Sequence, residues 1–531
     1  MGAYELDNST PRVYYVNKNA TGANNGTSWA DAFTDLQSAL NNACNQTTIY
    51  VAKGTYTPTV QVDFDKSGGA DVREVTFQIP AGVTIYGGFV GNEATIDAAT
   101  LAARDFTTNE TILTGDLSGN DAVTGTFPSL TYSNYTDNAY HVVYTRNSGQ
   151  NTVLDGFTIT GGNADGSNQN RYGAGWYNIA EGDNTTSSLT IRHTRFYRNR
   201  ISGAIAAGAG MYNEGLSNNA TTSLTLEEVT FSQNLGEYTA ASSRIYGIGL
   251  YNSASANGGT SSTVSGRISH LNLNQVTFSQ NQGTVTTGSV QGGGLYSAVS
   301  GTGSSANITM TQTTFSENRI SGQSSMLGGG FFNNGDVGTT NLTLTQCSFT
   351  KNYVKAAVNQ GAQGGGIWNR AQNNGGTADL TINRCTFSEN YVEATYPGGG
   401  GIHQEASGPN AQALLIINNS TFYKNELNSQ NDAFASALGG AIRLNTLNNT
   451  SIADATITNC SFIENITLGT GPTPDVSGGA VFMVQARNVG ESANVTIRNS
   501  IIWGNRAKGA LVLPILLLSI PLPKILPPVS S

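Results

Sequence analysis

The sequence predicts an all-β protein, a parallel β-helix (solenoid) built from stacked coils. A Phe-x-x-Asn motif recurs along the chain, and a Gly-rich motif such as "GGGIWN" alternates with it. Each unit also holds short segments that alternate apolar and polar residues, which is typical of strands. One unit is too small to bury its apolar side, so we expect the units to stack with their strands about 4.8 Å apart. The motif copies begin at Phe196, Phe231, Phe278, Phe315, Phe349, Phe387, Phe422 and Phe462.

The composition favours an extracellular protein. Of the 531 residues, 11% are charged and 64 are Gly, and the formal net charge is -9. Asn, Thr and Ser must therefore supply the polar surface, a balance typical of extracellular all-β proteins. The sequence has no basic patch, so nucleic acid is not an expected partner. Three of the four cysteines stand two residues before a repeated Phe, and we expect Cys347, Cys385 and Cys460 to be small buried apolar residues.

Residues 1–46 are expected to form an N-terminal strand and a capping helix. Trp29, Phe33, Leu36 and Leu40 have helical spacing, and Thr27 or Ser28 precedes them as an N-cap. Such a helix would cover the strand edges of the first coil. Residues 47–165 are then predicted to form wider, irregular first coils. The N-terminal residues lack a cationic start followed by an apolar run, so no secretory signal is expected among them.

Residues 166–505 are predicted to form the regular coils. Period-2 alternation places Leu380 and Ile382 on one side of a strand and Thr381 on the other. We expect the repeated Phe side chains to stack as a column inside the tube. The repeated Asn should turn a corner in αL geometry and bond backbone amides of neighbouring coils.

The residue before the repeated Asn alternates in charge along the chain. It is Glu317, Lys351, Glu389, Lys424 and then Glu464. These side chains lie one above another if one repeat forms one coil. Alternating sign then replaces a column of repulsion with weak ion pairs. The pattern therefore supports one coil per repeat.

Residues 506–531 form an apolar, proline-rich tail that differs from everything before it. Its prolines, and its short apolar run, argue against a membrane-spanning helix. Three interpretations stay open: a frameshifted or artificial end, an apolar strap over the last coil, and a membrane or sorting anchor. The prolines are Pro514, Pro521, Pro523, Pro527 and Pro528.

The Gly-rich strands predict an aromatic stripe on an outer face. In each strand the residue after the Gly-rich triplet should point inward, so the next one should point outward. Stacked rings there either stabilise the sheet beneath the following loop or form a contact surface for a glycan or another subunit. The candidate binding residues are Tyr177, Tyr212, Tyr251, Tyr296, Phe332 and Trp368.

The segment "DFDKSGGADVRE" is the strongest candidate for a metal site. Asp63, Asp65, Ser67, Asp71 and Glu74 have the oxygen spacing of a calcium-binding EF-hand loop. The flanking residues favour strands over helices, and a solvated Gly-rich loop is the alternative. The segment "GDLSGND" is a weaker second calcium candidate.

Few residue patterns in the sequence indicate a catalytic site. In the regular repeats the Asp residues are scattered and do not recur at one repeat position. His193, His270 and His403 are also dispersed. Glu317 and Glu389 would lie about 10 Å apart, but Lys351 between them favours a structural column over an acid/base pair.

Two sets of motifs carry a family resemblance over roughly residues 12–505. "GGGIWN" with "CTFSEN" resembles the GGA[ILV] and FxxN repeats of the polymorphic outer-membrane protein family of surface adhesins. "VTIYGGFVGNE" and "VLDGFTITGGN" are similar to segments of bacterial right-handed β-helix repeat proteins of the pectin-lyase-like superfamily. The resemblance implies a right-handed parallel β-helix and an extracellular or cell-surface location. It leaves activity open, because that superfamily includes polysaccharide lyases and non-catalytic proteins. No autotransporter barrel is recognisable after residue 505.

Together these observations predict a non-enzymatic, extracellular surface or structural protein that is adhesive or fibre-forming. Its expected partners are further copies of itself or a surface polysaccharide. Two alternatives remain, a polysaccharide lyase or hydrolase of the pectin-lyase-like type and a non-catalytic glycan-binding module.

Overall fold

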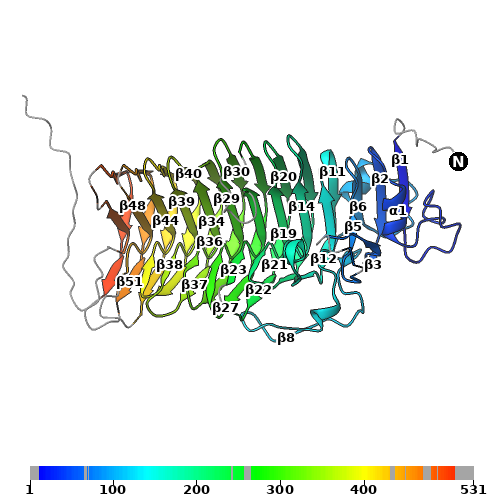
Figure 1. Cartoon of the computed structure of the whole chain (residues 1–531), viewed down its shortest axis with the longest axis horizontal. Helices are drawn as coiled ribbons and strands as arrows, with labels where there is room; N and C mark the ends of the chain where they lie inside the picture. Colours follow the sequence, from blue (N-terminus) through cyan, green and yellow to red (C-terminus); the bar gives the residue numbers. More distant parts are fainter. Residues whose placement is uncertain are drawn as a thin grey trace, which may run out of the picture.

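The structure, a computed structural model, describes residues 11–64, 68–69, 71–240, 243–255, 265–430, 437–448, 450–469, 480–486, 488 and 490–508. They form a parallel β-solenoid of about 12 turns, so the predicted all-β class and the stacking of coils are confirmed. Figure 1 shows the coils following one another along a single long axis, from β1 at one end to the last coil at the other. The right-handed sense of the coil stays a prediction from the resemblance.

Five sheets run along the solenoid, and we number them in the order in which the chain visits them within one coil. A representative coil consists of β34 (Phe331–Asp336), β35 (Thr339–Thr345), β36 (Ser348–Thr350), β37 (Tyr353–Ala356) and β38 (Gly361–Gln363). Apart from the antiparallel pair at the start of sheet 1, neighbouring strands in these sheets are parallel, as coil-on-coil stacking requires.

The sheets begin at different coils, but four of them end in the same one among the described residues. Residues 506–508 of the predicted tail form strand β55. Residues 509–531, and with them the three interpretations of the tail, lie outside the described residues. Sheet 1 runs from β4 (Val60–Gln61) to β52 (Phe482–Gln485), sheet 2 from β1 (Arg12–Val16) to β53 (Val495–Arg498), sheet 3 from β3 (Gly54–Tyr56) to β54 (Ile501–Trp503), sheet 4 from β13 (Asn163–Ala164) to β55 (Arg506–Lys508), and sheet 5 from β18 (Ile205–Ala207) to β43 (Tyr396–Gly398).

The N-terminal helix is shorter than the spacing predicts. Helix α1 spans Leu36–Asn42, and its N-cap is Asp35, whose side chain accepts a hydrogen bond from the Ser38 amide. Thr27 and Ser28 are therefore not the cap. Trp29 lies in a bend before the helix, and Phe33 forms an isolated parallel bridge with Val16. The helix buries Leu36 and Leu40 in the main core, but its role as a cap stays a prediction.

The repeated Phe residues form the predicted column inside the tube. Phe349 pairs in register with Phe387, and their ring centroids lie 4.9 Å apart with planes only 2° from parallel. The same stacking continues from Phe196 to Phe462, and each of these rings is fully buried. Cys347, Cys385 and Cys460 are free and buried in the same core, which confirms their predicted role as small apolar residues.

The repeated Asn residues form a second column, but they do not adopt the αL geometry. Asn390 Nδ2 donates to the Phe349 carbonyl and to Asn425 Oδ1, each at 2.8 Å. The residue before each Asn takes the left-handed conformation instead, as at Glu389 with φ of 54°. That residue turns its side chain to solvent, which leaves the Asn amide free to bond inside the corner.

The charged column at this corner confirms one coil per repeat. Lys351 Nζ lies 3.9 Å from Glu389 Oε2, and Lys424 Nζ lies 3.6 Å from Glu464 Oε2. All four side chains are about half exposed, so these pairs contribute little to stability.

Two of the described segments that leave the coils contact later coils. One connects β6 (Thr84–Phe89) to β7 (Thr111–Thr114) and contains α2 (Ala98–Ala102). The other contains the hairpin of β8 (Ala122–Thr124) and β9 (Thr131–Ser133), seen beside the stack in Figure 1. The Tyr132 hydroxyl of this hairpin donates to the Gln233 carbonyl, which fastens the hairpin to a later coil.

Candidate functional site

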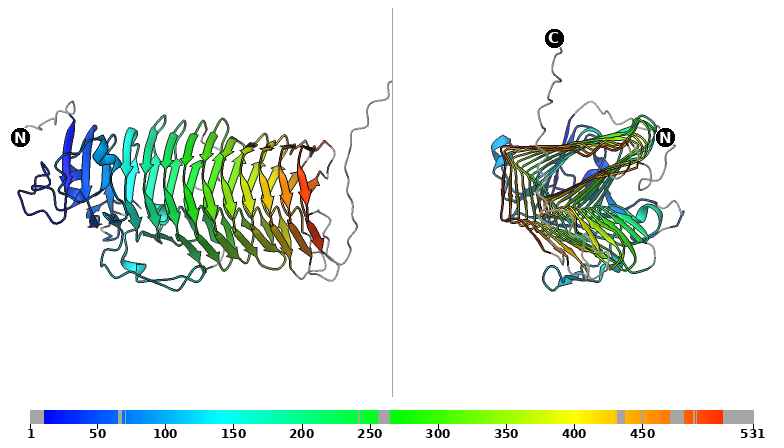
Figure 2. Two further views of the ribbon diagram at one scale, coloured as in Figure 1. Left: turned by 180° about the vertical axis from the view of Figure 1, so that it is seen from behind. Right: turned by 90° about the vertical axis from the view of Figure 1, so that its left-hand side faces the viewer.

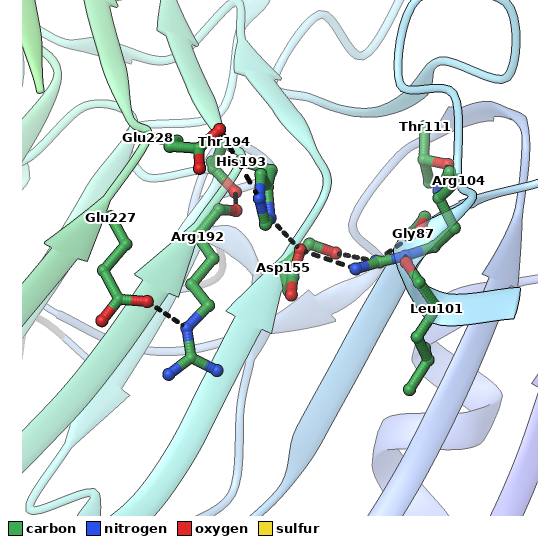
Figure 3. Close-up of polar contacts among 11 residues, drawn as sticks. Gly87, Leu101, Arg104, Thr111, Asp155, Arg192, His193, Thr194, Glu227 and Glu228 are labelled. Atoms are coloured by element: carbon green, nitrogen blue, oxygen red, sulfur yellow. Dashed lines mark hydrogen bonds and ion pairs between the residues drawn. The ribbon is translucent and has the colours of Figure 1, made fainter. Parts of the chain in front are cut away.

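A buried ionic cluster joins the α2 segment to the coils, and Figure 3 shows its side chains. Arg104 Nη2 lies 3.1 Å from Asp155 Oδ1, and both side chains are 5% exposed. His193 Nδ1 lies 2.8 Å from the same Asp155 oxygen. Asp155 ends β11 (Gly149–Asp155), and His193 follows β15 (Thr186–Arg192), which pairs with it. Two neighbouring coils therefore supply the carboxylate and the imidazole.

The α2 segment holds its arginine through backbone and ring contacts. The Arg104 guanidinium donates to the Leu101 carbonyl at 2.9 Å and to the Gly87 carbonyl at 3.0 Å. It also lies 4.9 Å from the ring centroid of Phe106, and that ring stacks on His193 at 4.9 Å. Because the guanidinium and the ring both come from one segment, the segment is clamped onto the coils by charge and by stacking.

The cluster shifts the pKa values of its acid and its imidazole in opposite directions. Burial alone would raise the pKa of Asp155, but the bonds from His193 and Arg104 outweigh it and lower that pKa below its usual range. The bond to Asp155 raises the pKa of His193, although partial burial opposes the change. Both shifts favour the charged forms, so the cluster behaves as an ion-paired clamp.

The chemistry around His193 is that of a structural contact. Its Nε2 faces Glu228 Oε2 at 3.8 Å, so the partners of the ring are two carboxylates and the Phe106 ring. A carboxylate carries no proton for an imidazole base to remove, so the two acids act on the ring as charge partners. We therefore assign the cluster a positioning role for the α2 segment.

Replacing Asp155 with Asn should lower the pKa of His193 towards or below its ordinary value of about 6.5. The raised pKa means that His193 stabilises the fold below the pKa of the unfolded state, and that this stabilisation is lost as pH rises through the folded-state pKa. Titration of the His193 ring protons by NMR measures the change. Glu228→Gln is the matched control, because Glu228 is more distant and more exposed, and it should cause a smaller shift. An unchanged His193 pKa in Asp155→Asn would contradict the assignment.

The six candidate binding rings point outward from sheet 1 but are not exposed. Tyr212 stacks on Tyr251 at 4.6 Å, and the residues before them, such as Met211, lie in the main core. All six rings are at most 4% exposed, so an open aromatic surface is wrong. Sheet 5 brings Tyr246 and Leu327 against the rings, and these residues share one apolar cluster with them. A glycan or a second subunit has no direct access to Tyr177, Tyr212, Tyr251, Tyr296, Phe332 or Trp368, and a binding role for them stays untested.

The same outer face holds a buried acid that the sequence analysis did not single out. Glu214 stands two residues after Tyr212 and is fully buried, and the Tyr212 hydroxyl donates to it. Burial raises the pKa of Glu214 to about 8, although Tyr212 and Arg267 oppose the change. The carboxyl therefore retains its proton at neutral pH and accepts a hydrogen bond within the aromatic stripe.

A surface groove lies on the far side of sheet 5 from the tube interior. It has a volume of about 540 Å³ and crosses strands of successive coils, from β18 to β33 (Met326–Leu327). Arg244 supplies a cation and serine hydroxyls supply most of the other polar groups, whereas the Tyr246 ring is 5% exposed and packs in the apolar cluster of the aromatic stripe. The lining residues include Ser243, Arg244, Tyr246, Ser289, Gln291 and Ser324.

The calcium candidate is described in part. Asp65 and Ser67 lie outside the described residues. Asp63 accepts from the Gly68 amide at 3.1 Å, and Asp71 accepts from the Tyr140 hydroxyl at 2.9 Å. Glu74 is buried, and its Oε1 accepts from the Phe64 amide.

The second calcium candidate is a loop whose first carboxylate accepts hydrogen bonds from the loop's own backbone amides. In "GDLSGND" the Asp116 carboxylate accepts from the backbone amides of Asn120 and Asp121. Within the described part of the chain, no group of three or more His, Cys, Asp or Glu side chains is placed to hold a metal ion. Calcium binding at either loop stays a prediction.

The fold and these sites define a parallel β-solenoid repeat protein. No protein family, curated protein or solved structure matches the chain. In the described ranges no helix is both long enough and apolar enough to span a bilayer.

Proposed function

We propose that this chain is a non-enzymatic, extracellular structural protein. It would be a rigid rod at a cell surface that is adhesive or fibre-forming. The observation that carries the proposal is the use of the repeated side chains. In the regular coils, Phe stacks on Phe, Asn bonds to Asn, and Lys pairs with Glu in the next coil. Stacking alone therefore accounts for the repeated residues, and no repeated acid or base is left for chemistry. The polar composition supports an extracellular location.

A panel of acidic and neutral polysaccharides tests the proposal against a lyase or hydrolase. We expect neither new reducing ends nor unsaturated products, with or without calcium. Turnover of any one polysaccharide would favour the enzymatic alternative. Surface labelling of intact source cells with an antibody tests the location, and labelling that requires lysis would count against it.

The groove on sheet 5 favours one second candidate function, the binding of a glycan without catalysis. Hydroxyl, amide and guanidinium groups bond to sugar hydroxyls. The groove offers Arg244, Ser289 and Gln291 for these contacts.

Replacing Arg244 and Gln291 with Ala together should abolish retention on an immobilised polysaccharide that retains the unaltered chain. Tyr396→Ala is the control, because Tyr396 is an exposed tyrosine that does not line the groove. Equal retention of the double variant would rule out the groove as the contact surface. The buried stripe rings are unsuitable for this test, because truncating them would disturb packing.

A further inference from the structure

We propose that the last coil of the solenoid docks onto the same coil of a second copy of this chain, so that two solenoids join end to end. The proposal names a partner for the rigid rod proposed above and selects a closed pair of rods over an open fibre. It depends on the fold and is independent of the protein's location, so its failure would leave the non-enzymatic assignment intact.

The last described coil exposes side chains that the earlier coils bury. Ile502 takes the position of the stacked Phe and is 53% exposed, whereas Phe462 in the preceding coil is 0% exposed. Ile497 is 38% exposed, and its partner Ile457 in the preceding coil is 0% exposed. The right-hand view of Figure 2 looks onto this end of the stack.

Backbone edges accompany this apolar surface. Sheets 1 to 4 end with β52, β53, β54 and β55, each paired on one side among the described residues. Exposed Ile501 and Trp503 lie in β54 itself. Unpaired edges next to exposed apolar side chains form a template for adding further strands.

The opposite end of the solenoid is different, because the chain covers its first edge. In β1, the backbone amide of Tyr15 donates to the Gly26 carbonyl at 2.9 Å, and the backbone amide of Phe33 donates to the Tyr15 carbonyl at 2.9 Å. The Asn17 amide also donates to the Phe33 carbonyl at 2.8 Å. The outer edge of sheet 2 at this end is therefore already bonded.

The difference between the two ends selects the symmetry of the assembly. A head-to-tail filament needs two complementary free ends. A two-fold axis lets the uncovered end meet itself, and an edge strand at the axis then pairs antiparallel with its own copy. End-to-end association therefore closes at two copies.

A second copy fits this end better than the chain's own apolar segment. Residues 510–531 follow β55 closely, but their five prolines lack the backbone N–H that a strand ladder uses. A second copy presents four edge strands in one coil. Arg498 lies on β53, and Arg506 and Lys508 lie on β55, so the two ends repel each other through these cations. Association should therefore tighten as salt screens that repulsion.

Sedimentation of the full chain over a range of concentrations and salt tests the proposal. We expect a monomer–dimer equilibrium that shifts towards dimer at higher salt, and electron microscopy should show rods of double length. The variant with Ile502→Lys and Trp503→Lys should weaken dimerisation at least about tenfold. Both side chains are exposed in the single chain, so its circular dichroism spectrum should not change. Tyr396→Lys, on an exposed side chain of sheet 5, is the control and should still dimerise.

Three results would overturn the proposal. The first is a monomer at every concentration, as expected if the chain's own apolar segment covers the end. The second is open-ended growth into longer rods, which would require a second free end. The third is an undiminished dimer in the double lysine variant.

Discussion

Replacing Phe387 with Ala should lower the free energy of unfolding of the surrounding coils by about 4 kcal/mol. The ring is fully buried and lies between Phe349 at 4.9 Å and Phe422 at 4.8 Å. Truncation leaves a cavity in the tube and removes the stacking partner of both neighbours. Because the column is continuous, two coil interfaces lose contact at once.

Native-state hydrogen exchange measures this effect best, because solenoids can unfold locally and a single two-state value is then ill defined. Amides of β36, β41 (Thr386–Ser388) and β46 (Thr421–Tyr423) should exchange faster than those of distant coils. Tyr396→Ala is the control, since the Tyr396 side chain is 39% exposed. This substitution should lower the free energy of unfolding by less than about 0.5 kcal/mol. Equal effects of the two variants would contradict the role of the column.

Replacing Asn390 with Ala should lower the free energy of unfolding by about 3 kcal/mol, although the Asn side chain is polar and smaller than that of Phe387. The amide donates to the Phe349 carbonyl and to Asn425 Oδ1. Its oxygen accepts from the backbone amide and the Nδ2 of Asn352. The substitution leaves several buried polar groups without a partner, and each one costs free energy.

Asn341→Ala is the matched control for this column. Asn341 also donates to an equivalent residue, Asn307, at 3.1 Å, but its side chain is at the surface, where water replaces the lost partner. Denaturant midpoints should fall clearly for Asn390→Ala and little for Asn341→Ala. Asn390→Asp should be at least as harmful as the Ala variant, because a carboxylate does not donate to the Phe349 carbonyl. An unchanged denaturant midpoint in Asn390→Ala would show that the stability of the corner does not depend on the Asn column.

The columns could be predicted because a repeat that stacks on itself places like residues together. Phe349 over Phe387 and Lys351 beside Glu389 both follow from the spacing alone. The sequence predicts the αL position one residue too late, because Asn commonly takes that geometry and Lys and Glu rarely do. The structure instead uses the Asn amide for bonds inside the corner, and the exposed residue before it takes the strained conformation.

Burial of the aromatic stripe could not be predicted in the same way. The outward direction of Tyr251 follows from alternation, but its burial depends on sheet 5, whose strands β23 (Ser243–Tyr246) and β28 (Gly288–Gln291) have no common motif. The N-terminal helix begins later than its apolar spacing predicts, because the side chain of Asp35, and not of Thr27 or Ser28, caps it.

The ionic cluster has even less local signal. Arg104 and Asp155 are 51 residues apart, and Asp155 and His193 are 38 residues apart, in segments of different type. No periodic pattern connects them, so only the path of the α2 segment brings them together. Glu214 resembles an ordinary surface residue in the sequence and is buried by tertiary packing.

The orientation of the strands determines how the rod responds to a pulling force. Strands run across the long axis, so the hydrogen bonds between coils lie along it. Tension on the C-terminal end therefore peels the outermost coil from its neighbour and loads few bonds at any moment. A coil of 38 residues would release about 130 Å of extended chain as it detaches. A force-extension trace should then show a series of small, nearly equal steps and not one large rupture.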